Sequence, residues 1–354
     1  MPPVVALEPL KDAVLILAGA IVLLSLALLI ERAASAFQRR RAMKKEAVLT
    51  ALVHGVVQGV PSVAQIKALS RFERRILRGM LLRLAPDLRG EAIDAIADLY
   101  RTTGLLKADV QRLRSWRAMT RAKAAADLGL LRAAEALPAL THALEDQDVR
   151  VRRAAAWGLG QAGGPETLAA LVRVLGDPSV TVARRAQEAL AERGQEVRDT
   201  ILSYASKSAN RSGRLAAIEL LGWLRIPGAA ELLIDLMTDL DPEVRVKSVK
   251  AAAAIGEPRF MDVFHRLLGD PRWEVRCQAA KGLTVFGSPD SVPLLAQSLR
   301  DPNWWVRFYA ATALSEAGAM GVEVLRAALE DPEPPVRSMA RYLLERGSAV
   351  PALP

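Results

Sequence analysis

The spacing of hydrophobic positions changes once along the chain, near residue 30. Residues 13–30 form one uncharged run, and twelve of these eighteen residues are Leu, Ile or Val. Beyond this run, apolar residues recur at helical spacing, and glycine or proline marks the breaks between helical segments. The pattern predicts an all-α protein with one long apolar helix followed by many shorter amphipathic helices.

The apolar run is long enough to cross a bilayer. At a rise of about 1.5 Å for each residue it spans about 27 Å, close to the thickness of the hydrocarbon core. Few cations precede the run and many follow it, so the positive-inside rule predicts a single crossing with the rest of the chain in the cytoplasm. A cleaved signal peptide is the competing interpretation, because Ala34-Ser35-Ala36 has the spacing of a cleavage site. We expect residues 1–31 to form a transmembrane anchor in the inner membrane of a bacterium.

Charge is distributed unevenly along the chain, whose formal net charge is +9. Residues 32–132 contain 21 Lys and Arg against 8 Asp and Glu, whereas residues 133–354 contain 26 against 28. The juxtamembrane segment, residues 32–61, begins with a basic cluster: Arg39, Arg40, Arg41, Lys44 and Lys45. This cluster is a topology signal in one interpretation and a patch for anionic lipid in the other, and the wider basic block is also suited to an acidic protein.

Residues 62–134 predict helices that depart from a regular repeat. Ser62 and Gln65 have the spacing of a capping box, which predicts a helix from Ser62 towards Leu84. Arginines alternate with apolar residues in its second half, so one face is apolar and another is cationic. Residues 91–100 and 108–131 predict two further helices. Terminal units of repeat arrays diverge in this way because they cover an exposed end of the core.

From residue 146 onward the sequence repeats itself. An aspartate recurs at intervals of 31, 64, 29, 31 and 30 residues, with a valine five residues later. The aspartates are Asp146, Asp177, Asp241, Asp270, Asp301 and Asp331. The residue after the valine is usually a cation, as in Arg152, Lys247, Arg276, Arg307 and Arg337, with Ala183 as the exception. A glycine closes most units: Gly163, Gly194, Gly287, Gly318 and Gly347.

Each repeated residue has a physical role. The aspartate ends one helix and caps the next, and the glycine permits the tight turn into the following unit. Valine and alanine on one helix face let neighbouring helices approach closely. A cation at the same position of successive units reaches the aspartate of an adjacent unit, which predicts a ladder of charged hydrogen bonds along the stack.

The repeated pattern, for example LRDPNWWVRFYAATALSEAG in residues 299–318, resembles the short bacterial HEAT-like repeats also found in phycobilin lyase subunits. The resemblance covers approximately residues 120–347. It implies an α-solenoid, a right-handed superhelix of helix pairs with an extended concave surface that holds other macromolecules. We expect HEAT-like repeats over residues 135–347 and a short tail over residues 348–354.

No cluster of residues predicts catalysis, a cofactor or a metal. Gly158, Gly160 and Gly163 satisfy G-x-G-x-x-G, but they close a predicted helix, whereas a dinucleotide loop follows a strand. The three histidines lie far apart and lack the paired His-Glu motifs of the HEAT-repeat di-iron hydroxylases. Cys277 has no nearby histidine to activate it. The repeats alone leave a lyase role open, although the membrane helix argues against it, and the charge balance of residues 133–354 argues against nucleic acid as a partner.

Four aromatic residues fall in one unit: Trp304, Trp305, Phe308 and Tyr309. Trp273 precedes Trp304 by one repeat, and the valines and proline at this position in other units indicate a packing role for both tryptophans. Trp305 has mostly polar or small counterparts, and it shares a helix face with Tyr309, four residues later. The hypothesis is that this pair is exposed and binds a protein partner, with local packing as the alternative.

Together these patterns predict a membrane-anchored scaffold or adaptor that binds protein partners at the cytoplasmic face and catalyses no reaction. The runner-up is an accessory subunit of a membrane enzyme complex, for example one that builds envelope polysaccharide. Neither interpretation needs a cofactor or a small-molecule substrate.

Overall fold

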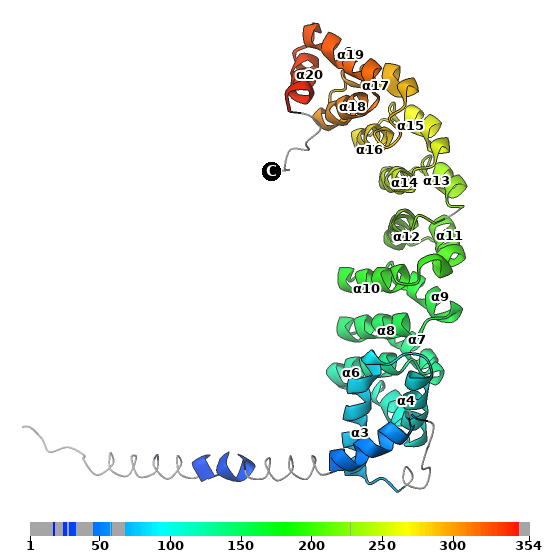
Figure 1. Cartoon of the computed structure of the whole chain (residues 1–354), viewed down its shortest axis with the longest axis vertical. Coiled ribbons are helices and arrows are strands. Elements are labelled where there is room, and N and C mark those ends of the chain that lie inside the picture. Colours follow the sequence, from blue (N-terminus) through cyan, green and yellow to red (C-terminus); the bar gives the residue numbers. More distant parts are fainter. Residues whose placement is uncertain are drawn as a thin grey trace, which may run out of the picture. The chain divides into compact units, whose positions relative to one another are not determined.

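The computed structural model describes residues 17, 24–26, 28–32, 45–56, 58, 68–226 and 228–346 of the 354-residue chain. All regular structure in these ranges is helical, which confirms the predicted all-α class. The chain divides into two compact units, Met1–Gln111 and Arg112–Pro354, and Figure 1 labels their helices.

Most of the predicted membrane helix lies outside the described residues. Within residues 13–30, positions 17, 24–26 and 28–30 are described, and they are helical. Across the described part of the chain, no helix is long and apolar enough to cross a bilayer. The basic residues Arg39, Arg40, Arg41 and Lys44 also lie outside the described ranges.

The first unit contains a helical segment over residues 45–56 followed by α3 (Arg71–Leu84), α4 (Glu91–Thr102) and α5 (Leu105–Arg112). α3 begins at Arg71 because Ser70 and Glu73 form a capping box. The helix start predicted at Ser62 lies outside the described residues. Glu73 also accepts an ion pair from Lys45 at 2.8 Å, and this hydrogen bond is the largest cause that lowers the pKa of Glu73 to about 2. Lys45, a member of the predicted lipid-proximal cluster, is therefore bound to α3.

A buried carboxylate joins α3, α4 and α5 of this unit. Asp109 on α5 is almost fully buried and accepts hydrogen bonds from Nε of Arg78 on α3, at 3.0 and 3.2 Å, and from the hydroxyl of Tyr100 on α4. A buried charge is tolerated when it is paired and hydrogen-bonded in this way. The arginines of α3 were expected to form a cationic face, but the guanidinium of Arg78 binds the buried Asp109.

The second unit is a stack of helix pairs in two rows, which Figure 1 shows side by side. The inner row lies on the concave side of the stack and comprises α6 (Ala118–Leu131), α8 (Val149–Ala162), α10 (Val180–Ala191), α12 (Arg211–Trp223), α14 (Pro242–Ile255), α16 (Trp273–Leu283), α18 (Trp304–Glu316) and α20 (Pro334–Arg346). The outer row comprises α7 (Leu137–Ala143), α9 (Pro165–Val174), α11 (Arg198–Lys207), α13 (Ala230–Leu236), α15 (Met261–Leu267), α17 (Val292–Ser298) and α19 (Ala319–Ala327). The predicted solenoid is confirmed, and its right-handedness stays a prediction.

Short capped turns separate the outer helices from the inner ones. Asp146 accepts the N–H of Asp148 at 2.8 Å, and Asp148 accepts the N–H of Arg150 at 2.9 Å, so two aspartate side chains satisfy backbone donors in the turn and in the first turn of α8. Ser115 holds the position equivalent to Asp146 one repeat earlier, and its hydroxyl accepts the N–H of Arg117 at 3.3 Å. This turn divides the single helix predicted over residues 108–131 into α5 and α6. The regular pattern thus already appears at Ser115, ahead of the expected start of the repeats at residue 135.

The predicted ladder of charged hydrogen bonds is present along the stack. An arginine of one inner helix binds the turn aspartate that lies 25 residues further on: Arg121–Asp146, Arg152–Asp177, Arg214–Asp239, Arg245–Asp270 and Arg276–Asp301. Hydrogen bonds from Arg121 are the largest cause that holds the pKa of the Asp146 carboxyl below its usual value. Each pair therefore joins two consecutive repeats through a charged hydrogen bond of 2.6–2.8 Å.

The structure corrects the register of one unit. The turn aspartate there is Asp239 and the ladder cation is Arg245, whereas the sequence pattern had indicated Asp241 and Lys247. Asp241 caps α14, and Lys247 binds Glu219 at 3.1 Å. With this correction the turn positions as far as Asp301 follow each other at a constant 31 residues: Ser115, Asp146, Asp177, Ser208, Asp239, Asp270 and Asp301. Asp331 forms the last turn after 30 residues.

One pair of the ladder is replaced by two uncharged residues. Ser208 stands at the turn position and accepts the N–H of Asn210 at 3.2 Å, so it caps the turn without a charge. The position of its arginine partner, 25 residues earlier, is held by Ala183. Both members of the pair differ together, which leaves neither a carboxylate nor a guanidinium without its partner at this junction between α10 and α12.

A residue with positive φ follows each inner helix from α6 to α18, at the same 31-residue spacing. Five of these positions are glycines, Gly163, Gly194, Gly256, Gly287 and Gly318, and two are arginines, Arg132 and Arg225. Arg132 has φ of 51° and Arg225 has φ of 45°. A side chain makes this conformation unfavourable because Cβ approaches the carbonyl oxygen, so both arginines occupy positions suited to glycine. The predicted role of glycine is confirmed for the described positions, and Gly347 lies outside them.

We expect Arg225→Gly to raise the free energy of unfolding by about 1 kcal/mol, because it removes the strain of a left-handed residue. Arg225 is exposed, so the change removes little packing. Chemical denaturation of the purified protein measures the effect, and Arg225→Ala is the matched control because alanine keeps the strain. Equal gains in the two variants would mean that the side chain, and not the backbone conformation, is responsible.

Small residues let the inner helices approach each other closely. A Cβ atom added to Gly129 would overlap the Cα of Gly158 in the next inner helix, and one added to Gly160 would overlap Ala189. The same relation joins Gly222 to Ala251. The G-x-G-x-x-G match at Gly158 therefore consists of two packing glycines and the turn glycine Gly163, as the helix-closing interpretation predicted.

Candidate partner-binding surface

The four aromatic residues on α18 form one stacked cluster. Phe308 is its buried centre, and the Trp304 ring stacks on it with centroids 5.2 Å apart and an interplanar angle of 9°. Trp305 meets Trp304 edge-to-face at 4.7 Å and stacks with Tyr309 at 6.4 Å. The ring of Tyr342 on α20 completes the contact with Phe308 at 6.2 Å. Offset and edge-to-face pairs of this kind hold a rigid aromatic surface in place.

Exposure within the cluster differs from the expectation. Trp304 is 38% exposed, as is Trp273 at the same position one repeat earlier, although both were expected to be packing residues. Trp305 and Tyr309 are half-buried, whereas they were expected to be the exposed pair. The reason is that Trp304 and Trp273 are the first residues of their helices, where a neighbouring helix covers only part of a large ring.

A cation lies beside the aromatic surface. Nζ of Lys281 on α16 is 5.1 Å from the centre of the Tyr309 ring, within the range of a cation–π interaction. The ammonium group is exposed, so it remains available to a carboxylate of a bound partner. Trp273, Trp304, Trp305, Tyr309 and Lys281 therefore combine exposed aromatic edges with one positive charge, and we call these five residues the aromatic surface.

Cys277 on α16 does not add a reactive group to this surface. Its side chain is buried, and burial raises the pKa of the thiol to about 11. The thiol is therefore protonated at neutral pH, and a nucleophilic thiolate is not available. Within the described residues, no group of three or more His, Cys, Asp or Glu side chains is arranged to hold a metal ion.

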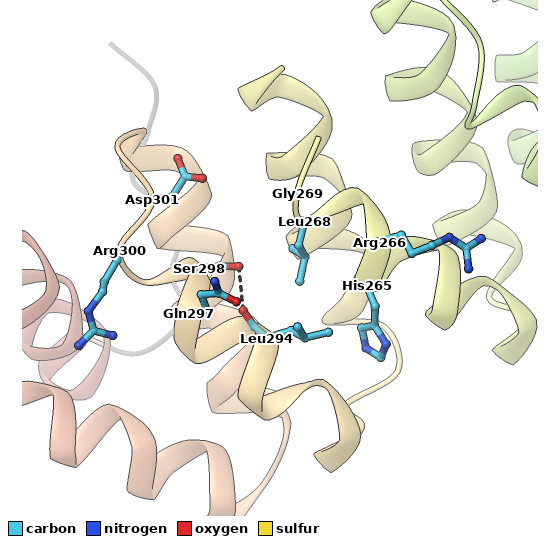
Figure 2. A pocket seen from close by; sticks show the side chains of 9 residues that line it. All are labelled: His265, Arg266, Leu268, Gly269, Leu294, Gln297, Ser298, Arg300 and Asp301. Atoms are coloured by element: carbon cyan, nitrogen blue, oxygen red, sulfur yellow. Dashed lines mark hydrogen bonds between the residues drawn. The ribbon is translucent and has the colours of Figure 1, made fainter. Parts of the chain in front are cut away.

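A cavity of about 540 Å³ lies between the ends of α15 and α17, and Figure 2 shows its lining. His265 is half-buried, and its Nε2 hydrogen-bonds Ser291 Oγ at 2.8 Å. Arg266 and Arg300 extend towards opposite sides in Figure 2, and Arg300 is paired with Asp331. The charged groups therefore do not converge on one point in the cavity.

The same cavity recurs four repeats earlier. A smaller one of about 220 Å³ lies between α7 and α9, where Thr141 has the place of His265 and Asp177 has the place of Asp301. A cavity that returns with the repeat is a product of stacking helix pairs. The aromatic surface, by contrast, depends on residues found in only two of the repeats, which makes it the better candidate for specific binding.

A model of HEAT repeats matches residues 106–191, 198–271 and 261–345, which is most of the chain. The chain belongs to the HEAT-repeat family. This agrees with the turn aspartates, ladder arginines and closing glycines described above, and it begins close to the first regular turn at Ser115. None of the curated proteins compared with this HEAT-repeat protein matches it in sequence.

Several solved structures resemble the chain distantly. The CpcE–CpcF complex of phycocyanin lyase from Nostoc is 20% identical, with a TM-score of 0.31, and the match covers 62% of this chain and 92% of that one. Human deoxyhypusine hydroxylase is 21% identical, with a TM-score of 0.30, and coverage is 86% and 97%. A karyopherin bound to the extreme C-terminus of a protein phosphatase is 16% identical, with a TM-score of 0.39, and coverage is 83% and 45%. Enzymes and binding proteins thus both occur among these structures.

Proposed function

We propose that this protein is a membrane-anchored scaffold of the bacterial inner membrane, with its HEAT repeats in the cytoplasm holding a protein partner. The aromatic surface of α16 and α18 is the observation that carries the proposal. It concentrates two exposed tryptophans, two half-buried aromatic rings and one lysine on adjacent helices. Tryptophan and tyrosine are over-represented among the residues that dominate binding energy at protein interfaces.

The membrane location is supported by the sequence. The uncharged run of residues 13–30 has the length of a bilayer crossing, and the cations that follow it favour a cytoplasmic location for the repeats. Anchoring confines the aromatic surface to a thin layer beside the membrane. A partner in the same layer, such as the cytoplasmic part of a membrane protein, is then bound at a high effective concentration, so a weak contact suffices.

The chemistry of the surface indicates what kind of partner segment it holds. The exposed edges of Trp273 and Trp304 are suited to an apolar or proline-containing segment, because flat rings stack on such side chains with little loss of conformational freedom. Lys281 adds a preference for a carboxylate near that segment. The proposed role is binding alone, since no reacting group lies on this surface.

Affinity capture from detergent-solubilised membranes tests the proposal. We expect Trp304→Ala to weaken recovery of the partner by roughly 30-fold, the loss expected of an interface residue that contributes about 2 kcal/mol. Trp305→Ala should also weaken recovery, with a moderate loss of stability because the residue is half-buried. A chain lacking residues 1–31 should lose the partner if the anchor brings the two together.

The controls separate binding from folding. Phe308→Ala removes the buried centre of the cluster and should cost about 3–5 kcal/mol of stability. Trp304→Ala removes a partly exposed ring that stacks on Phe308, so it should lower the melting temperature clearly less than Phe308→Ala. A large loss of stability in Trp304→Ala would assign this tryptophan to the core. Undiminished recovery by a well-folded Trp304→Ala variant would remove the aromatic surface from the proposal.

A further inference from the structure

A second distinctive surface lies at the other end of the repeats, where the inner helices α6, α8 and α10 begin. Large apolar side chains are exposed there: Trp116 by 83%, Met119 by 62% and Val180 by 72%. Trp116 lies in the turn before α6, Met119 is the second residue of α6, and Val180 is the first residue of α10. Apolar groups therefore project from successive turns on one edge of the stack.

Cations accompany these apolar groups. Arg117 lies in the turn before α6. Arg153 on α8 and Arg184 on α10 are equivalent to each other, because they are one repeat apart. All three are exposed, and none has an ion-pair partner in the part of the chain that the structure describes. Arg117 instead covers the Trp116 ring at 4.7 Å. We call Trp116, Arg117, Met119, Arg153, Val180 and Arg184 the cationic edge.

Nearby acidic groups are already neutralised. Asp148 is paired with Arg150, and the turn aspartates Asp146 and Asp177 are paired with ladder arginines. Further along the same edge of the stack, Glu243 and Glu274 hold the position that Met119 and Arg150 have in the first repeats, and they are paired with arginines. The position of Arg153 and Arg184 is held in the later repeats by Leu215, Val246 and Cys277, so this pair of exposed arginines belongs to the first repeats.

We propose that the cationic edge docks onto anionic lipid headgroups. Tryptophan prefers the interface between water and hydrocarbon, and arginine beside it attracts negatively charged lipid. The apolar side chains stand on separate turns, and neighbouring helices in a stack are about 8–10 Å apart. Separate tips suit a fluid layer of headgroups, whereas a protein partner is held by residues gathered in a packed pocket.

Docking deepens the proposed function and rests on it in one respect, since the anchor is what keeps the edge close to lipid. With the edge on the membrane, the stack acquires a defined orientation instead of turning freely about its anchor. The aromatic surface, several repeats away on α16 and α18, is then presented to a partner from a fixed side.

Tryptophan fluorescence of the full chain in vesicles tests the docking. The chain is reconstituted in phosphatidylcholine alone or in equal parts of phosphatidylcholine and phosphatidylglycerol, each with and without brominated phosphatidylcholine as the quencher. We expect quenching in the anionic vesicles that is lost at high salt, and a clearly smaller quenched signal in Trp116→Phe. The paired change Arg153→Glu with Arg184→Glu should shift the docking equilibrium by about 30-fold towards the free state.

Matched variants separate this site from general effects of charge and fluorescence. Trp223→Phe removes another exposed tryptophan, away from the edge, and should retain the quenching. Arg266→Glu with Arg341→Glu makes the same change of charge on two other exposed arginines and should leave docking intact. Circular dichroism confirms that the variants are folded.

Two results would overturn the docking. One is equal quenching in neutral and anionic vesicles, or none in either. The other is a double variant, Arg153→Glu with Arg184→Glu, that keeps the quenching but no longer captures the partner. This result would mean that the cationic edge binds a protein and not lipid. A chain without a membrane anchor would give a different result, because it would not float with neutral vesicles. Flotation with anionic vesicles would still measure binding by the cationic edge.

Discussion

Replacing Asp270 by alanine is expected to lower the free energy of unfolding by about 3–5 kcal/mol, the cost of leaving one member of a buried ion pair alone. The Asp270 carboxylate accepts two hydrogen bonds from Arg245, at 2.8 and 2.9 Å, and a third from the N–H of Arg272 at 2.8 Å. Its side chain and that of Arg245 are 6% and 12% exposed. The variant therefore loses the bond between two repeats and leaves a guanidinium with little access to water.

The protein itself contains the control for this experiment. The double variant Arg245→Ala with Asp270→Ser reproduces the uncharged residues found at Ala183 and Ser208. We expect it to be more stable than Asp270→Ala alone, because no unpaired charge remains and serine still caps the turn. Urea denaturation followed by circular dichroism measures the midpoints. A double variant that loses the sum of the two single effects would show that the residues act independently.

Gly129→Ala is expected to cost about 3 kcal/mol, because a single methyl group must separate two helices that touch through their backbones. The added Cβ would overlap the Cα of Gly158, which has no flexible side chain to move aside. The displacement would affect α6 and α8 together and should also reduce the cooperativity of unfolding, since each repeat is stabilised mainly by its neighbours. Thermal and chemical denaturation measure both quantities.

Gly79→Ala is the matched control for this substitution. Gly79 lies inside α3, and a Cβ atom there would have Nη1 of Arg83 as its nearest neighbour at 3.9 Å. Alanine should therefore stabilise the protein by up to about 1 kcal/mol through its higher helix propensity. Similar losses of stability at both positions would contradict a specific role for the contact between Gly129 and Gly158.

Much of the fold could be predicted from the sequence because the repeated residues have specific roles in capping helices and forming turns. Turn aspartates, ladder arginines and closing glycines recur with the repeat, and most of them form the contact that their chemistry predicts. Arg307 and Arg337 are exceptions, because they donate to backbone carbonyls of their own turns, and Asp331 is paired with Arg300 instead. The register failed near Asp241 because two aspartates, Asp239 and Asp241, stand two residues apart, and both are used. Only the hydrogen bonds distinguish the residue that closes the turn from the residue that caps the helix.

The first repeat was missed for a similar reason. Ser115 forms the turn with a hydroxyl in place of a carboxylate, and Arg132 takes the left-handed position usually given to glycine. A pattern search based on aspartate and glycine does not detect either substitution. The helix predicted over residues 108–131 therefore appeared continuous, although its middle contains a capped turn.

The candidate site was harder to predict than the fold. The four aromatic residues were correctly grouped, since helical spacing decides which side chains are neighbours. Which of them reaches solvent depends on how far the next helix covers the first turn of α18, and this is not encoded in residue type. The cationic edge was also missed, because its members are spread over three repeats and become one surface only when the repeats stack.

The uncharged junction formed by Ala183 and Ser208 gives the stack a preferred place to bend. The neighbouring repeats are linked by an ion pair between an arginine and the aspartate of the next turn, whereas α10 and α12 have no such ion pair at this position. Elastic compliance should therefore be greatest near the centre of the array. Under load, or on meeting partners of different width, the arc would open or close at this joint while the segments on either side keep their curvature.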